Sequence, residues 1–377
     1  MNEQLKPIYR HLHENAELSG TEAATQRYIL DKLAELGIET LTYEGQNAVV
    51  GIIRGGKPGK TIALRADMDA LPIAEKTGLP FKSKTEGVMH ACGHDAHMAI
   101  ALGAAMLLNK NRANLHGNVK LVFEPQEETK GGGRDMVAAG CLENPKVDAV
   151  IGLHMNPDFP LGTVYTKPEA VSGGSTDIRI EICGKACHGA YPERGVDAIL
   201  VGAQVVMALQ SLVSRNLSPF DSAALSIGQI EGGSAANVVC ETLRLHGTLR
   251  TLSKQTEAFM RTRIEEVVNG VCAANRATAK VVFRDSYQSL YNDLDLHRIL
   301  EACADKEKLV IRPFPSLGVE SFSFFIQNTP GLYYDLGCGK GTPIHTDTFQ
   351  IDEDVLKIGA ELQAAIATKF LNGGECK

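Results

Sequence analysis

The sequence has no cluster of lysine and arginine, and its 45 acidic residues outnumber its 38 basic ones, which gives a formal charge of -7. Binding to nucleic acid needs a basic surface that neutralises phosphates, so we expect no nucleic acid partner. The chain also lacks an apolar run of the roughly 20 residues that a membrane-spanning helix requires. The N-terminal segment is charged and has no apolar signal sequence. These absences predict a cytoplasmic protein without a membrane partner.

The nine cysteines are odd in number and irregularly spaced, which argues against a disulfide framework. We expect most of them to be small buried apolar residues, in particular Cys141, Cys272 and Cys303 on apolar stretches, with Cys92 as the exception. The chain contains 44% hydrophobic and 22% charged residues, as is typical of globular proteins. Its 377 residues exceed the ~250 to 300 at which a single core stops growing, so two domains are expected.

The first part of the chain alternates predicted strands with predicted helices. Ser19 and Glu22 resemble a capping box, and the apolar residues that follow at helical spacing predict a helix that ends near Gly37. Continuous apolar runs predict strands at 47–55, 61–67, 118–125 and 147–155, with helices at 98–109 and 133–139. This alternation predicts an α/β fold with a mostly parallel sheet that is covered on both faces.

The pattern changes after the Gly/Ser-containing stretch 167–177. The next elements are a strand at 177–183, a helix at 196–213, strands at 223–230 and 242–250, a helix at 255–273 and a strand at 278–284. This βαββαβ order is that of the ferredoxin-like split unit. Helices at 293–304 and 352–371 and a strand near 332–335 would then complete the first domain. We therefore predict a discontinuous domain, 1–175 with 289–377, that is interrupted by a second domain, 176–288.

Acidic and imidazole side chains follow the predicted strands of the first domain. Asp67 and Asp69 end one strand, Glu127 and Glu128 follow the next, and His154 ends the third; the segment HACGHDAH (90–97) lies between them, and His345 lies in a loop near the end. Ligands of open α/β sheets collect outside the carboxyl ends of the strands. We therefore expect these side chains to lie near one another.

The clustering of these residues favours a metal site. A lone His345 would more often be a core or capping histidine than a metal ligand. A thiolate, imidazoles and carboxylates would be costly to bury together, whereas a divalent ion would neutralise them. Cys92 and His94, two residues apart in a loop, could face one ion, with His97 on the next helical turn orienting the segment.

The adjacent Glu127 and Glu128 have two interpretations. Taken alone, they could form a solvated acidic turn. Beside a metal, two carboxylates allow a division of roles, because a carboxylate that binds the ion cannot freely accept a proton. One glutamate would then be a ligand and the other a general base for the attacking water.

A set of motifs along nearly the whole chain resembles the amidohydrolase branch of the aminoacylase/carboxypeptidase metallopeptidase superfamily. That branch includes hippurate hydrolases, auxin-amino-acid hydrolases and N-acetyl-amino-acid deacetylases. The matching segments, in the order and spacing typical of the branch, are RADMDALP (65–72), HACGHDAH (90–97), EPQEETKGGG (124–133), GLHM (152–155), CHGAYPERGVDAI (187–199), GGSAANVVCETLRLHGTLRTL (232–252), GVESFSFF (318–325) and PIHTDTF (343–349).

The resemblance implies a metallopeptidase-like catalytic domain that binds two divalent metal ions. The residues at the metal-binding positions are Cys92, His94, Glu128, His154 and His345, with Cys92 between the two ions and Glu127 as general base. These ligands suit zinc, manganese, cobalt or nickel, so the sequence does not determine the identity of the metal. The wider superfamily has His-x-Asp where this chain has Arg65-Ala66-Asp67. Arginine cannot bind a cation, so we expect Asp67 to support the ligands instead.

The resemblance also implies that the inserted domain is a lid through which the protein forms a homodimer. His188 matches a residue that lies over the neighbouring subunit's active site and stabilises the oxyanion. Asn237 and Arg250 match substrate-binding positions, and the Arg250 guanidinium suits a carboxylate. Without the resemblance, His188 would be interpreted as a surface histidine and Arg250 as part of a salt bridge.

Two motifs depart from the family pattern. Thr129 and Lys130 follow the glutamate pair where glycines are common, and Ser321 stands where the family has an aspartate. Either change could alter the substrate pocket. Neither involves a residue at a metal-binding position.

The expected reaction is hydrolysis of an N-acyl amino acid, with an acetyl, benzoyl or similar acyl group, to a carboxylate and a free amino acid. One alternative is a dipeptidase or carboxypeptidase with the same metals. Another is a non-catalytic metal-containing binding protein. Closed structural sites use four ligands and no base, whereas five candidate ligands and an additional glutamate are present in this sequence.

Overall fold

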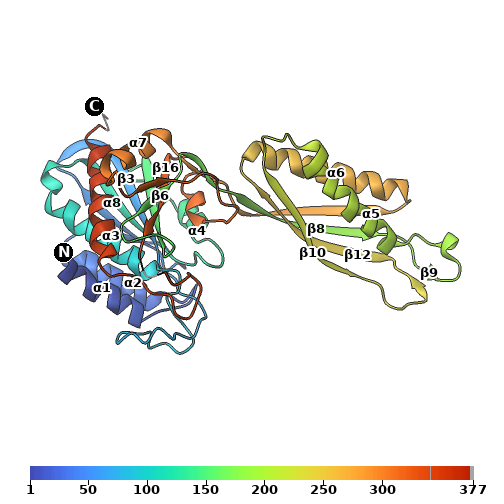
Figure 1. Ribbon diagram of the computed structural model, residues 1–377, viewed down its shortest axis with the longest axis horizontal. Helices are drawn as coiled ribbons and strands as arrows, with labels where there is room; N and C mark the ends of the chain where they lie inside the picture. Colours follow the sequence, from blue (N-terminus) through green and yellow to red (C-terminus); the bar gives the residue numbers. More distant parts are fainter. Residues whose placement is uncertain (340, 374–377) are drawn as a thin grey trace. The chain divides into compact units, whose positions relative to one another are not determined.

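The computed structural model describes residues 1–339 and 341–373. They form two compact units, shown in Figure 1. Of the described residues, unit 1 contains 1–171, 291–314, 320–339 and 341–373, and unit 2 contains 172–290 and 315–319. The predicted domain limits at 175/176 and 288/289 lie close to these boundaries. The return of 315–319 to unit 2 was not predicted. Cys376 lies outside the described residues.

Unit 1 is built on an eight-stranded sheet. Its strands, in spatial order, are β1 (Glu39–Thr42), β2 (Val49–Arg54), β4 (His116–Glu124), β3 (Lys57–Asp67), β5 (Ala149–Asn156), β16 (Gly331–Gly337), β6 (Val164–Thr166) and β15 (Leu309–Ile311). The four central strands, β4, β3, β5 and β16, are parallel. Strand β2 pairs antiparallel with both β1 and β4. The prediction of a mostly parallel sheet in an α/β fold is therefore confirmed.

Unit 1 also contains helices, most of which contact this sheet. They are α1 (Asn2–Glu14), α2 (Ala23–Glu35), α3 (His94–Lys110), α4 (Gly133–Ala138), α7 (Leu294–Cys303) and α8 (Val355–Leu371), with 3-10 turns η1 (Arg112–Asn114) and η4 (Ser321–Phe324). Figure 1 shows α1, α3 and α8 side by side, and all three contribute to one apolar core. Helices α3 and α8 approach closely because Gly103 faces Ala360, where an added Cβ would lie 2.7 Å from its neighbour.

Helix α3 begins at His94, so this residue lies on the first turn of the helix and not in the expected loop. The predicted capping box before α2 is also wrong. The Ser19 hydroxyl donates to the Asp69 carboxylate, and the Glu22 carboxylate accepts the N–H groups of Gly20 and Gln126. Instead, the Glu17 carboxylate accepts hydrogen bonds from the N–H groups at the start of α2.

Unit 2 has the element order expected for a split βαββαβ fold. Its main elements are β8 (Gly174–Cys183), α5 (Ala198–Ser211), β10 (Ala223–Gly232), β12 (Thr242–Thr251), α6 (Lys254–Ala274) and β13 (Thr278–Tyr287). The four strands form an antiparallel sheet in the order β10-β12-β8-β13, and the helices bury its apolar face. Its shorter elements are β9 (Cys187–His188), η2 (Pro192–Arg194), η3 (Leu212–Asn216) and β11 (Val238–Val239). The short strands β7 (Glu169–Ser172) and β14 (Leu290–Asn292) pair with each other at two of the points where the chain passes from one unit to the other.

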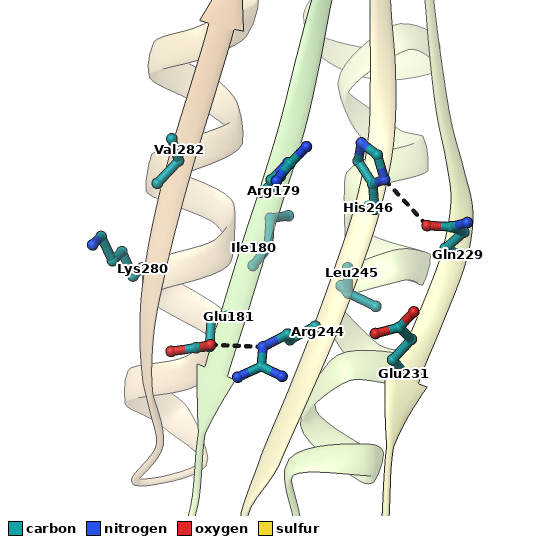
Figure 2. A pocket seen from close by; sticks show the side chains of 10 residues that line it. All are labelled: Arg179, Ile180, Glu181, Gln229, Glu231, Arg244, Leu245, His246, Lys280 and Val282. Carbon is teal, nitrogen blue, oxygen red and sulfur yellow. Dashed lines mark hydrogen bonds and ion pairs between the residues drawn. The ribbon is translucent and has the colours of Figure 1, made fainter.

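The other face of this sheet is polar, as Figure 2 shows. Side chains from four strands line a shallow hollow of about 420 Å³. The strand register sets Glu181 of β8 opposite Arg244 of β12, and their side chains form an ion pair of 2.8 Å. The residues that line the hollow include none of the predicted site residues.

By length and composition alone, the segment Ala198–Asn216 is long and apolar enough to cross a membrane. The expectation that the chain has no apolar run of this length did not take this segment into account. It begins with α5, whose Val201, Val205 and Leu209 are buried in the core of unit 2. A core helix can meet the same length and composition criteria, so this segment is weak evidence for a membrane span.

Candidate metal centre

The structure brings the five predicted metal ligands together near the carboxyl ends of the central strands. Two groups of side chains each have their potential ligand atoms within 4.8 Å of one another. The first group is Cys92, His94 and His154, and the second is Cys92, Glu128 and His345. Cys92 therefore belongs to both groups, as a residue between two ions would.

The Cys92 sulfur lies between two imidazoles. Its Sγ is 3.3 Å from Nε2 of His154 and 3.2 Å from Nε2 of His345. On the other side, Oε1 of Glu128 lies 3.3 Å from Nε2 of His345 and 3.9 Å from Nε2 of His94. The turn with His345 is joined to the Cys92 segment by a hydrogen bond from its N–H to the Ala91 carbonyl, 2.7 Å long.

These residues fit divalent cations. Nε2 of His94 and Oε1 of Glu128 are buried and have no hydrogen-bond partner among the described residues. Buried polar atoms of this kind normally have a partner, so both point to a ligand. One thiolate, three imidazoles and a carboxylate are donors that zinc and other transition metals accept.

The electrostatics of the cluster also favour cations. Burial alone would raise the pKa of the Cys92 thiol, but the imidazoles of His154 and His94 lower it to about 6. The adjacent Cys92 thiol and Glu128 carboxylate raise the pKa of His345 to about 10. Raised imidazole pKa values reflect a negative local potential, and a bound metal would displace these protons.

Hydrogen bonds behind the cluster fix the orientation of the imidazoles. Nδ1 of His94 donates to the Asp69 carbonyl at 2.8 Å, and Nδ1 of His154 donates to the Met155 carbonyl at 2.8 Å. In both rings this leaves Nε2 as the nitrogen available to a metal.

Asp67, His94 and His97 form a further group with suitable spacing, but both nitrogens of His97 already have partners. Nδ1 of His97 donates to Asp67 at 2.6 Å, and Nε2 accepts the Met155 N–H at 2.9 Å. This geometry agrees with the expectation that His97 orients the segment. Asp67 likewise bonds to His97 and to Arg65, as expected of a supporting residue.

Comparison with known proteins gives the family. Residues 63–369 match the peptidase family M20/M25/M40. The chain belongs to this family. An N-acetyl-L-cysteine deacetylase from Bacillus subtilis is 39% identical over 376 residues, which covers 100% of this chain and 90% of the relative. Thermostable carboxypeptidase 2 from Saccharolobus solfataricus is 38% identical over 374 residues, 97% of this chain and 95% of the relative.

Solved structures agree with the M20/M25/M40 assignment. A putative aminohydrolase from methicillin-resistant Staphylococcus aureus has a TM-score of 0.91 and 33% identity, and covers 99% of this chain and 97% of its own. A dinuclear metal-binding peptidase of the M20 family from Bacillus subtilis has a TM-score of 0.87 and 33% identity, with 98% of both chains covered. The protein is thus a metal-dependent hydrolase of amide bonds, and the alternative of a non-catalytic binding protein is disfavoured.

In this member of the M20/M25/M40 family, a buried arginine supports the centre from behind. Arg65 donates to Asp67, Glu124 and the Ser321 hydroxyl, each at 2.6 Å, and lies 3.1 Å from Glu320. The departure at Ser321 therefore gives Arg65 a neutral partner where an aspartate is common.

Glu127 lies beside the same centre. Its Oε1 accepts a hydrogen bond of 3.2 Å from the Ser321 N–H. Burial and the nearby Glu320 carboxylate raise the pKa of Glu127 well above its usual range. Glu127 and Glu128 both come within reach of His94, so the structure brings the predicted base and the predicted ligands to one place.

Asp69 is a supporting residue whose role the sequence reasoning missed. Its two carboxylate oxygens accept the N–H groups of Glu127 and Glu128, each at 3.0 Å. The available signal was its position two residues after Asp67, at the carboxyl end of β3.

The three remaining predicted residues lie in unit 2. His188 on β9 and Asn237 are brought together by the pairing of β9 with β11. Nδ1 of His188 accepts the Ala190 N–H at 3.1 Å, so Nε2 carries the proton of the neutral ring. Arg250 on β12 has a buried Nη1 without a hydrogen-bond partner among the described residues, and burial lowers its pKa.

Proposed function

We propose that the protein hydrolyses N-acyl amino acids to a carboxylate and a free amino acid. The observation that carries this proposal is the position of Cys92 in two ligand groups, with Glu127 beside them. Relatives named N-acetyl-L-cysteine deacetylase and N-acetyldiaminopimelate deacetylase, 39% and 35% identical to this chain, support an acylated amino acid as substrate.

In this proposal, Cys92, His94, Glu128, His154 and His345 hold two divalent ions. When bound, such ions polarise the amide carbonyl and lower the pKa of water towards ~7. Glu127 accepts the proton of the attacking water and returns it to the leaving amine. A raised pKa suits this role, because a general base works best when its pKa lies near the working pH.

The residues of unit 2 would bind the substrate. His188, with its proton on Nε2, would lie over the active site of the neighbouring subunit and donate to the developing oxyanion there. The unpartnered Nη1 of Arg250 would bind the substrate carboxylate, with Asn237 as a further contact.

We also propose a cytoplasmic homodimer that forms through unit 2. Large apolar side chains on α5, among them Ile199, Leu200 and Met207, are about half exposed or more, at 48%, 55% and 74%. Exposed apolar patches of this kind often mark protein interfaces. A measured mass of two chains in solution would support this assembly, and a monomer would count against it.

A carboxypeptidase is the second candidate, because two relatives from Saccharolobus solfataricus, each 38% identical, carry that name. The two activities differ in whether the pocket accepts an acyl chain or a free amino terminus. A panel of acetyl, benzoyl and longer N-acyl amino acids, together with dipeptides, would separate them.

The Glu127→Gln variant tests the proposed base. Glutamine keeps the size of the side chain but cannot accept the proton, so kcat should fall by about 10²- to 10⁴-fold. Metal content, measured by atomic emission, should stay that of the wild type. The exposed Glu86→Gln is the matched control and should keep full activity. Full turnover of Glu127→Gln would refute the assigned base.

A further inference from the structure

The buried carboxylate of Glu22 has no role in the proposed reaction, yet it contacts the turn that carries Glu127. Glu22 is fully buried. Its Oε1 accepts the N–H groups of Gly20 and Gln126, both at 2.9 Å. Its Oε2 accepts the Asn47 side-chain amide at 2.9 Å. Glu22 therefore anchors the residue that directly precedes the proposed base.

The Asp69 carboxylate continues this pattern along the same turn. It accepts the N–H groups of Glu127 and Glu128, so three successive backbone donors, at 126, 127 and 128, bond to two buried carboxylates. The Ser19 hydroxyl, three residues before Glu22, donates to Asp69. We call Glu22 and Asp69 the carboxylate clamp.

The clamp holds a backbone conformation that is unfavourable by itself. Gln126 has a φ of 60°, in the left-handed region that is unfavourable for residues other than glycine. Successive N–H groups around a left-handed residue form a concave nest that binds anions. Here the anions are supplied by the protein. Their hydrogen bonds offset the strain and keep the turn in one conformation.

We propose that Glu22 is a positioning residue, which sets the place of Glu127 through the backbone of Gln126. This inference rests on the proposed function only where it names Glu127 as the base. Without the Glu22 carboxylate, the N–H of Gln126 loses its acceptor and the left-handed turn can relax. A displacement of about 1 Å at a catalytic group can reduce the rate by ~10²-fold.

Three variants of the metal-loaded, full-length protein test the clamp. Glu22→Ala removes the acceptor. Glu22→Gln keeps a carbonyl oxygen that can accept both backbone N–H groups, and the Asn47 amide can reverse to match it. Glu17→Ala is the matched control, because Glu17 bonds to Ala24 and Thr25 on the same segment but not to the 126–128 turn.

Two measurements are made on each variant. In steady-state kinetics, Glu22→Ala should lower kcat by about 10- to 100-fold with KM changed by less than about 3-fold, and Glu22→Gln should recover most of kcat. In hydrogen exchange, the amides at 126–128 should exchange at least about 10-fold faster in Glu22→Ala than in the wild type. Glu17→Ala should leave kcat and these amides unchanged.

The kinetic and the exchange measurements distinguish a failure of the clamp proposal from a failure of the proposed function. If the wild type hydrolyses no N-acyl amino acid, the proposed function fails, but exchange at 126–128 still tests the clamp. Unchanged exchange in Glu22→Ala overturns the clamp. An equal loss of kcat in Glu17→Ala also overturns it, because the effect would then come from general destabilisation of the segment.

Discussion

Replacement of Arg65 by methionine should strongly destabilise unit 1. The Arg65 guanidinium is fully buried and lies among the carboxylates of Asp67, Glu124 and Glu320. Methionine keeps much of the side-chain volume but removes the positive charge that faces these three carboxylates. Removal of one partner from a buried ion pair typically costs ~3 to 5 kcal/mol, because it leaves an uncompensated buried charge.

Arg10 provides a matched control with similar geometry and little burial. Its Nε and Nη2 donate to the two oxygens of Glu353 at 2.6 and 2.8 Å, but its side chain is 47% exposed. Exposed pairs contribute about 1 kcal/mol or less. Arg10→Met should therefore have a small effect on the free energy of unfolding.

Urea unfolding followed by circular dichroism would measure both variants. We expect the midpoint of Arg65→Met to fall well below that of Arg10→Met, by an amount that corresponds to at least about 2 kcal/mol. Equal midpoints for the two variants would contradict the reasoning, because burial would then make no difference.

Two further predictions concern pH and the backbone. Burial lowers the pKa of His13, but hydrogen bonds to Asp95 and Glu75 raise it to about 9, so its stabilising charge is fully present below about pH 6.5 and is lost as the pH rises through about 9. Urea unfolding should show this alkaline loss in the wild type, and its persistence in His13→Asn would contradict the assignment. Gly93 has a φ of 91°, and an added Cβ would lie 2.9 Å from a neighbouring side chain, so Gly93→Ala should lose bound metal. Gly87 has a φ of 72° and no neighbour within 4 Å of an added Cβ, so Gly87→Ala should keep its bound metal. Equal metal content in the two variants, measured by atomic emission, would contradict this prediction.

The main elements of the fold could be predicted because their apolar runs are long. Strand β5 is buried along most of its length, and its sequence has the continuous apolar character of a parallel strand. Helix α1 was missed, although Leu5, Ile8 and Leu12 have helical spacing. Pro7 lies inside this helix and obscures the pattern, since proline normally interrupts helices.

The candidate site was predictable where ligands follow strands, and less so elsewhere. Glu128 and His154 could be placed by strand ends, whereas His345 lies in a turn that is held by a hydrogen bond to distant Ala91. The prediction of a capping box from Ser19 and Glu22 was wrong for a related reason. Its local signature is that of a helix cap, but the partly buried N–H groups at 126–128 need acceptors, and this long-range requirement decides where both side chains bond.

The position of the insertion affects when the centre can assemble during synthesis. Four of the candidate ligands precede unit 2 in the chain, and His345 follows it. A nascent chain that ends within unit 2 therefore has only one of the two ligand groups complete. Because unit 2 has a core of its own, it can fold on the ribosome before the last ligand is made. Capture of the second cation should thus be among the last events in the maturation of this protein.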